Sequence, residues 1–288
     1  ACLIEDGEIL SATHAERLSR KKNDRWLHTK QKYLKNLAHK VSFFEKNWLK
    51  FSRQWYSGQK ELADFRLSKY EYSHYHHESH AAAGFYTSKF DKCNILVIDA
   101  IGEWDTVSVW EGWMDRNKPK MKKVWSRKYP YSIGLFYSAI TKAVGLKPQE
   151  DEYITMGMAA YGEPKYYDEY KEILDNHNCH KGVPKVLKGY PNDIAASAQL
   201  LVEEEIIKIV KNHCHHENLI MMGGVALNCV ANSRVAKLGK KIWIMPNPGD
   251  CGSALGTAAL TYGKKINWEH PYLGTEIKST INVKEVVR

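Results

Sequence analysis

The chain contains three short apolar runs that each stop at a turn of small or acidic residues, and this pattern restricts the folds it can adopt. The runs cover residues 94–99, 219–222 and 242–245. Between and after them, residues 132–144, 194–213 and 253–263 carry apolar side chains at helical spacing, and Asn192-Asp193 is the expected N-cap of the second helix. Strands that alternate with helices predict an α/β fold.

The length fits either one large domain or two lobes around a cleft, because 288 residues, 43% of them hydrophobic, can bury a large core. Asp6-Gly7 predicts a β-hairpin turn near the start, and residues 106–110 predict a further strand. Near Lys92 the composition changes from a histidine- and alanine-rich helix to apolar strands. We therefore expect a first lobe over 1–92, a second over 93–263 and a C-terminal extension over 264–288.

Most of the net charge of 42 − 33 = +9 lies in residues 15–60, whose pattern is helical. Basic residues there are interleaved with Trp26, Tyr33 and Trp48. One interpretation is an electropositive surface for phosphorylated or nucleic-acid ligands. The other, which we favour, is a pair of helices with lysines in water and aromatic rings in the core.

The six cysteines are scattered without a Cys-x-x-Cys pair, which predicts free thiols in a reducing compartment. No apolar run reaches the roughly 18 to 20 residues of a membrane span, and the first residues do not resemble a signal peptide. We therefore expect a cytoplasmic protein without a membrane partner. Because Ala1 already lies in an apolar strand, we also expect further residues upstream.

His76 and His80 stand four residues apart on an expected helix, so their side chains share one face and could bind one metal ion. The alternative is an ordinary polar helix face. Asp250 is a third candidate ligand, since it follows a strand at the edge where side chains emerge from a sheet. Two imidazoles and one carboxylate would leave coordination positions open, as a catalytic metal requires. His213-Cys-His-His216 lacks a matching second cluster and is not expected to bind metal.

Two glycine turns follow strands in the second half of the chain. Gly223-Gly224 leads to Asn228, and Gly249 opens a similar helix start. Glycines at such places let backbone amides approach a phosphate, although a tight strand-to-helix turn needs them equally. Asp151-Glu152 is either an exposed acidic loop or a pair of carboxylates that grip a ribose. Together the two glycine turns favour a nucleotide pocket.

These segments, in this order, resemble the NodU/CmcH-type carbamoyltransferases, O-carbamoyl transferases that modify antibiotics and nodulation factors. The matching segments are residues 7–12, 16–22, 76–85, 99–103, 151–162, 223–232 and 248–256. The resemblance covers nearly the whole chain. It implies an actin-like ATPase (ASKHA) fold, with two RNase-H-like lobes and a nucleotide cleft between them.

The resemblance further implies that a carbamoyl-adenylate, made from carbamoyl phosphate and ATP, is held in the cleft and passes its carbamoyl group to a hydroxyl-bearing acceptor. A divalent metal, iron by resemblance, would be bound by His76, His80 and Asp250. The nucleotide contacts would fall on Asp99, Gly102, Gly223, Gly224, Asn228 and Gly249. The candidate catalytic residues are His77 and Glu103, either of which could remove the hydroxyl proton, and Asp151, which could position the substrate.

This sequence departs from the family at both ends. Family members begin with an earlier strand, and they continue past a segment like residues 271–274 into a YrdC-like domain that makes the carbamoyl-adenylate. We therefore expect either a fragment or a chain that receives the adenylate from a separate YrdC-like protein.

Two alternative functions stay open. A tRNA threonylcarbamoyl-type transferase is favoured by the basic residues 17–60 but opposed by residues 156–162 and 226–229, so nucleic acid is the less favoured partner. The other alternative is a non-catalytic nucleotide-binding remnant.

Overall fold

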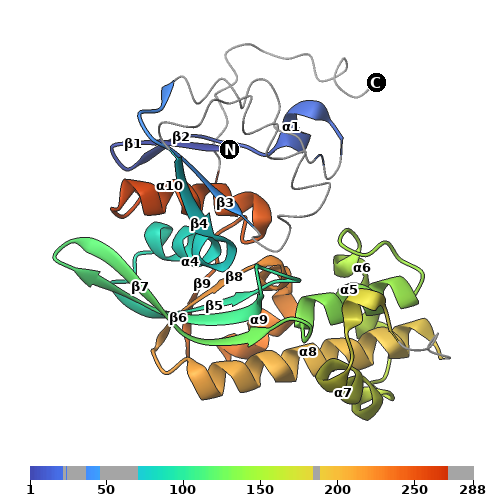
Figure 1. Ribbon diagram of the computed structural model, residues 1–288. Helices are drawn as coiled ribbons and strands as arrows, with labels where there is room; N and C mark the ends of the chain where they lie inside the picture. Colours follow the sequence, from blue (N-terminus) through green and yellow to red (C-terminus); the bar gives the residue numbers. More distant parts are fainter. Residues whose placement is uncertain (22–23, 25–36, 46–70, 184–188, 272–288) are drawn as a thin grey trace, which may run out of the picture.

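A computed structural model describes residues 1–21, 24, 37–45, 71–183 and 189–271 of the chain. Its centre is a five-stranded sheet in the order β7-β6-β5-β8-β9 (Figure 1). The strands are β5 (Lys92–Ile98), β6 (Asp105–Asp115), β7 (Lys118–Lys128), β8 (Asn218–Met222) and β9 (Lys241–Trp243). β6 is antiparallel to β5 and β7, whereas β5, β8 and β9 are parallel. Counted along the chain, this is the order 3-2-1-4-5 of an RNase-H-like lobe, which confirms the α/β prediction.

Helices cover both faces of this sheet (Figure 1). α4 (His76–Thr87) and α10 (Ser253–Tyr262) pack on one face, and α5 (Ile133–Ala143), α8 (Pro191–His213) and α9 (Cys229–Ala236) pack on the other. β5 serves both cores, because successive side chains of a strand point to opposite faces. Ile95 and Val97 belong to the core with α4, whereas Leu96 and Ile98 belong to the core with α8. This double burial explains the unbroken apolar run in the sequence.

Each of the three predicted helices is present, but the predicted N-cap of α8 is wrong. α8 begins at Pro191, ahead of Asn192-Asp193, because the fixed φ of proline suits the first helical position. The Asp193 carboxylate instead accepts hydrogen bonds from Glu163 N (2.8 Å) and Lys165 Nζ (2.7 Å). Further helical segments in the described part of the chain are α6 (Glu152–Met158), α7 (Tyr167–Asn176), η3 (Ala159–Tyr161), η4 (Cys179–Lys181), η5 (Gly224–Leu227) and η6 (Asp250–Gly252).

The N-terminal residues form two small sheets, of which the β1–β2 hairpin lies above α10 and the β3–β4 pair runs across it in the view of Figure 1. β1 (Cys2–Glu5) and β2 (Glu8–Ala12) form the predicted hairpin, with positive φ angles of 48° at Asp6 and 90° at Gly7. α1 (Ala15–Ser19) follows, and β3 (Val41–Glu45) pairs in parallel with β4 (Glu71–Tyr75).

The helical prediction for residues 15–60 is therefore wrong over residues 41–45. The hydrogen bonds of the β3–β4 ladder join segments about thirty residues apart, and local spacing does not reveal such pairing. Most of the basic stretch, including Trp26, Tyr33 and Trp48, lies outside the described residues.

The layer of α4 and α10 lies between the N-terminal strands and the five-stranded sheet (Figure 1). α10 contacts the N-terminal strands through Ser42, whose Oγ donates to Thr257 O (3.1 Å), and through His74, whose Nε2 is 3.1 Å from Thr261 Oγ1. α4 precedes Lys92 and yet packs into the core of the five-stranded sheet. Residues 264–271 pack back as well, since Ile266 N donates to Tyr86 O (2.9 Å). The domain limits 1–92, 93–263 and 264–288 stay a prediction.

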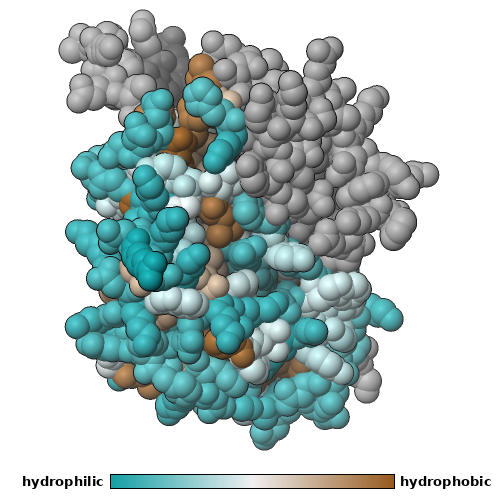
Figure 2. All heavy atoms as spheres, turned by 60° about the vertical axis from the view of Figure 1, so that its left-hand side comes forward, coloured by the Kyte–Doolittle hydropathy of each residue, from teal (hydrophilic) through white to brown (hydrophobic). Residues whose placement is uncertain are grey.

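The edge strand β7 carries a second concentration of positive charge, because six of its eleven residues are Lys or Arg. Lysines on an edge strand discourage pairing with other chains. Figure 2 shows the face that lies on the left of Figure 1, which is largely hydrophilic with small, separate hydrophobic patches.

All six cysteines are unpaired, as predicted. Within the part of the chain that the structure describes, no helix is long and apolar enough to cross a membrane.

Candidate metal centre

The N-terminal turn of α4 carries the predicted histidine pair. His76 is the first residue of the helix and His80 lies one turn later, and both side chains are fully buried. The helix lies close to the sheet because Gly84 faces β8, where an added Cβ would be 2.5 Å from Ile220 Cγ2. The Glu103 carboxylate accepts a hydrogen bond from His76 N, which satisfies a backbone donor at the start of the helix.

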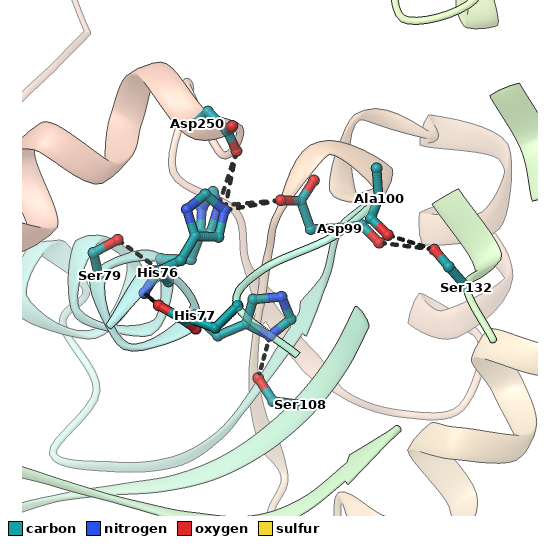
Figure 3. A network of polar contacts seen from close by, with 10 residues as sticks. His76, His77, Ser79, Asp99, Ala100, Ser108, Ser132 and Asp250 are labelled. Atoms are coloured by element: carbon teal, nitrogen blue, oxygen red, sulfur yellow. Dashed lines mark hydrogen bonds and ion pairs between the residues drawn. The ribbon is translucent and has the colours of Figure 1, made fainter. Parts of the chain in front are cut away.

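Two aspartates reach these histidines from distant parts of the chain. Asp99 directly follows β5, and Asp250 begins η6, just ahead of α10. α10 contacts α4 so closely that a Cβ on Gly256 would be 1.8 Å from Ser79 O. Figure 3 shows His76 between the carboxylates of Asp99 and Asp250.

The four side chains offer one ligand atom each, and these atoms all lie within 4.8 Å of one another. His76 Nε2 is 2.9 Å from Asp99 Oδ2, 3.2 Å from Asp250 Oδ1 and 3.1 Å from His80 Nε2. His80 Nε2 is 3.3 Å from Asp250 Oδ1 and 3.8 Å from Asp99 Oδ2. Bonds of about 2.0–2.2 Å to one metal ion would set neighbouring ligand atoms roughly 3.0–3.5 Å apart. The donor set therefore fits a divalent transition metal that accepts imidazole and carboxylate ligands.

The carboxylates determine the charge of the cluster. Burial disfavours the charged form of His80, but its hydrogen bonds to Asp250 and Asp99 outweigh burial and raise its pKa to about 9. Partial loss of water around the Asp250 carboxylate and the nearby Asp99 act to raise the pKa of Asp250, but His76 and His80 outweigh them and hold this pKa below its usual range. In the absence of a metal, the cluster thus holds a proton where a cation would bind, and a bound metal ion would displace that proton.

His77 points away from this cluster, toward Ser108 on β6 (Figure 3). Its Nδ1 is 2.8 Å from Ser108 Oγ, which also accepts a hydrogen bond from Trp110 Nε1 (2.8 Å). Gly102 makes room for the ring, because a Cβ there would be 2.4 Å from His77 Cδ2. The structure thus gives Gly102 a packing role, and its predicted nucleotide contact stays a prediction.

The two glycine turns lie side by side, since Gly223 N donates to Pro248 O (2.9 Å). Gly223 has a φ of 87°, and a Cβ there would be 2.2 Å from Ile98 O, so only glycine fits. Gly224 is exposed and borders Asp99, where a Cβ would be 3.4 Å from Oδ1. A Cβ on Gly249 would meet no atom within 4 Å. Gly224, which is exposed, and Gly249, which is half-buried and directly precedes Asp250, both offer accessible backbone beside the cluster.

Asn228 caps α9, because its Oδ1 accepts a hydrogen bond from Ala231 N (3.0 Å). Its amide also exchanges two hydrogen bonds with Gln199 of α8, at 2.9 and 3.1 Å. Tyr137 and Glu203 extend this buried network. The structure thus gives the Asn228 side chain a role in joining α9 to α8, and its predicted nucleotide contact stays a prediction.

Asp151 lies at the start of α6, where its Oδ2 accepts a hydrogen bond from Lys147 N (2.9 Å). Its hydrogen bonds stay within residues 147–155, so the structure does not join it to the histidine–aspartate cluster. Its predicted positioning role stays a prediction.

Sequence reasoning assigned Asp99 to the nucleotide and missed its place beside the histidines. A signal was present, because Asp99 and Asp250 both follow parallel strands, whose carboxyl ends meet at one edge of the sheet. The buried Gln199 network carried no comparable signal.

Comparison with known proteins identifies the family. Residues 30–259, most of the chain, match the family model for the carbamoyltransferase N-terminus. The chain belongs to this family. Its resemblance to NodU-type carbamoyltransferases is thereby confirmed.

The chain is similar to several longer proteins. An uncharacterized Synechocystis protein is 37% identical over 240 residues, which cover 70% of this chain and 37% of that protein. Nodulation protein NolNO of Sinorhizobium fredii is 29% identical over 210 residues, which cover 64% of this chain and 30% of that protein. Nodulation protein NolO of Bradyrhizobium diazoefficiens is 28% identical over 212 residues, or 64% of this chain and 37% of that protein. The chain thus spans about a third of the length of these relatives.

Solved structures give more remote likenesses. An activator of 2-hydroxyisocaproyl-CoA dehydratase from Clostridium difficile with bound ADPNP is 16% identical, with a TM-score of 0.48, over 89% of this chain and 86% of that chain. Full-length HypF in its phosphate- and nucleotide-bound form is 14% identical, with a TM-score of 0.47, over 77% of this chain and 38% of that chain.

Proposed function

We propose that this chain transfers a carbamoyl group from a carbamoyl-adenylate to a hydroxyl of an acceptor molecule. The observation that carries the proposal is the cluster of two histidines and two aspartates, which lies beside an exposed glycine turn in a member of a carbamoyltransferase family. The adenylate would come from carbamoyl phosphate and ATP, through a YrdC-like domain or protein. We further propose that its nucleotide part lies along the Gly223-Gly224 turn.

His76, His80, Asp99 and Asp250 would hold a divalent metal ion, for which iron is our first candidate. When bound, the metal supplies Lewis-acid polarisation of the carbamoyl and phosphate oxygens. Asp250 is the most open of the four residues, with 53% of its side chain exposed, and it therefore marks the substrate side of the cluster.

The reaction needs no nucleophile from the protein. The acceptor oxygen forms a bond to the carbamoyl carbon, the bond from that carbon to the phosphate oxygen breaks, and AMP leaves with the electron pair. The hydroxyl proton must pass to a base. Of the candidates, we favour Glu103, whose partly exposed carboxylate contacts the first residue of α4, over His77, which is only 1% exposed.

The proposal is tested by metal binding and by product mass. Purified chain should bind Co²⁺ in a 1:1 ratio, and with a YrdC-like enzyme, carbamoyl phosphate and ATP it should add about 43 Da to hydroxyl-bearing acceptors. If the chain binds no metal and His80→Ala changes neither measurement, the catalytic proposal fails. The non-catalytic nucleotide-binding alternative would then be the better description.

A further inference from the structure

Two large aromatic side chains next to the cluster take no part in either hydrophobic core. Tyr75 directly precedes His76 and is 63% exposed, and Trp104 directly follows Glu103 and is 59% exposed. The contact between Glu103 and His76 N brings these two short segments together. The backbone of Trp104 is fixed as well, because its carbonyl accepts a hydrogen bond from Tyr129 N (2.8 Å).

The order of the strands gives the site two different sides. β5 lies between β6 and β8 in the sheet, and Asp99 directly follows β5. Asp99 therefore lies between the turn that follows β8 and the turn that precedes β6. On the β8 side lies the Gly223-Gly224 turn, which presents backbone and small residues. On the β6 side lies the turn of residues 100–104, which presents Glu103 and the exposed Trp104. The β8 side therefore suits phosphates, and the β6 side suits a ligand with an apolar face.

Exposed aromatic residues are common one at a time, but two of them in segments that meet beside a polar cluster are typical of a binding surface. A flat aromatic ring packs on the apolar face of a ligand ring, and nearby carboxylates accept hydrogen bonds from its hydroxyl groups. Glu103 and Asp250 supply such carboxylates here.

We propose that Trp104 and Tyr75 form the acceptor side of the site, where they bind the apolar face of a ring that carries the reacting hydroxyl. This inference rests on the proposed function, since it concerns the acceptor of that reaction. It gives the two ligands opposite sides of Asp99: the nucleotide lies over the carboxyl end of β8, and the acceptor ring lies over the turn of residues 100–104, at the start of β6. Trp104 and Tyr75 thereby decide acceptor affinity without themselves serving as metal ligands.

The test compares two probes with similar hydroxyl groups, only one of which has a ring face. Saturation-transfer NMR on the full chain would use methyl β-D-glucopyranoside and its open-chain counterpart sorbitol. We expect transfer to the glucoside and little to sorbitol. Trp104→Ala should reduce the glucoside signal at least fivefold and Tyr75→Ala less, while Trp104→Phe, which keeps a ring, should restore most of it. Tyr190→Ala, which removes a 64% exposed tyrosine at the start of α8, is the matched control and should change nothing.

The proposal is overturned if both probes give equal signals, if the glucoside gives none, or if Trp104→Ala binds like the unchanged chain. Co²⁺ titration of the same samples separates this proposal from the preceding one. Normal Co²⁺ binding without a Trp104-dependent glucoside signal refutes the acceptor side alone. A Trp104-dependent glucoside signal without Co²⁺ binding refutes the metal-assisted transfer and leaves the ring-binding surface.

Discussion

The two ends of α4 lie against basic side chains in different surroundings. At the first turn, His76 and His80 face the carboxylates of Asp99 and Asp250. At the last turn, Lys265 donates hydrogen bonds to the carbonyl oxygens of Phe85 (2.5 Å), Ser88 (3.1 Å) and Phe90 (3.0 Å). Its Nζ also lies 3.9 Å from the centre of the Phe85 ring.

The pKa values of His80 and Lys265, at the two ends of α4, are shifted in opposite directions. Carboxylates more than offset the burial of His80, and its pKa rises to about 9. At Lys265 burial dominates over weaker attraction from Cys93 and Asp91, and its pKa falls to about 8. Full negative charges can therefore retain a buried cation, whereas neutral carbonyl dipoles and an aromatic face do so less well. The first turn is suited to bind a metal ion, and the last turn is suited to fix the helix.

Removal of a ligand at the first turn should have the largest effect. Loss of a group that only supports a metal ligand costs 10 to 100-fold in affinity. His80→Ala removes a ligand itself, and we expect Co²⁺ affinity and carbamoyl transfer to fall about a thousandfold. Isothermal titration and turnover assays would measure this. His213→Ala, which removes a histidine that stacks on Trp125, should leave both unchanged, and an equal loss in the two variants would contradict the assignment.

Glu103→Gln should distinguish the two roles of Glu103, which accepts a hydrogen bond at the start of α4 and is the proposed base. The glutamine carbonyl can still accept the hydrogen bond from His76 N, so Co²⁺ affinity should change less than about threefold. It cannot take a proton, and kcat should fall about a hundredfold. Unchanged kcat in steady-state assays would show that another group is the base.

The affinity for metal should depend on pH through His80. Because its pKa is raised above that of a free histidine, the metal-free cluster keeps the proton up to about pH 9, and a metal ion must displace it. Co²⁺ affinity should rise about tenfold per pH unit between pH 6.5 and 9 and then level off. Titrations in two buffers of different ionisation enthalpy would count the released proton. A flat profile from pH 7 to 9 would contradict the charge state described above.

Lys265→Met should have the smallest effect and act on stability alone. The substitution removes hydrogen bonds to carbonyl oxygens at the end of α4, which lowers stability. Because burial of a methionine side chain costs less free energy than burial of a lysine ammonium group, the free energy of unfolding should fall by only about 1–2 kcal/mol. Urea unfolding would measure this. Lys264→Met, which changes the exposed neighbouring lysine, is the control and should change the free energy of unfolding by less than about 0.5 kcal/mol. A loss of Co²⁺ affinity in Lys265→Met would mean that the two ends of α4 are coupled.

Local patterns allowed much of the fold and part of the site to be predicted. The apolar run of β5, the hairpin turn at Asp6-Gly7 and the four-residue spacing of His76 and His80 are local features, and each predicted the element found. Asp250 was also placed correctly at a sheet edge, although its role as a metal ligand stays a proposal.

The features that sequence reasoning missed depend on contacts between distant segments. The strand at residues 41–45 depends on β4, and the position of Asp99 beside His76 depends on where α4 docks on the sheet. The hydrogen bonds between Asn228 and Gln199 likewise join distant segments and could not be predicted locally, while the predicted nucleotide contact of Asn228 stays a prediction.

The parallel pairing of β5 with β8 and β9 has a consequence for the order of folding. His76 and Asp99 are close in sequence, whereas Asp250 reaches them only after a chain of about 150 residues has returned through two crossover connections. Contacts between such distant segments form slowly because the intervening chain must first be ordered. The complete set of four candidate ligands therefore exists only in the fully folded chain, and the proposed metal binding would stabilise that state over partly folded ones.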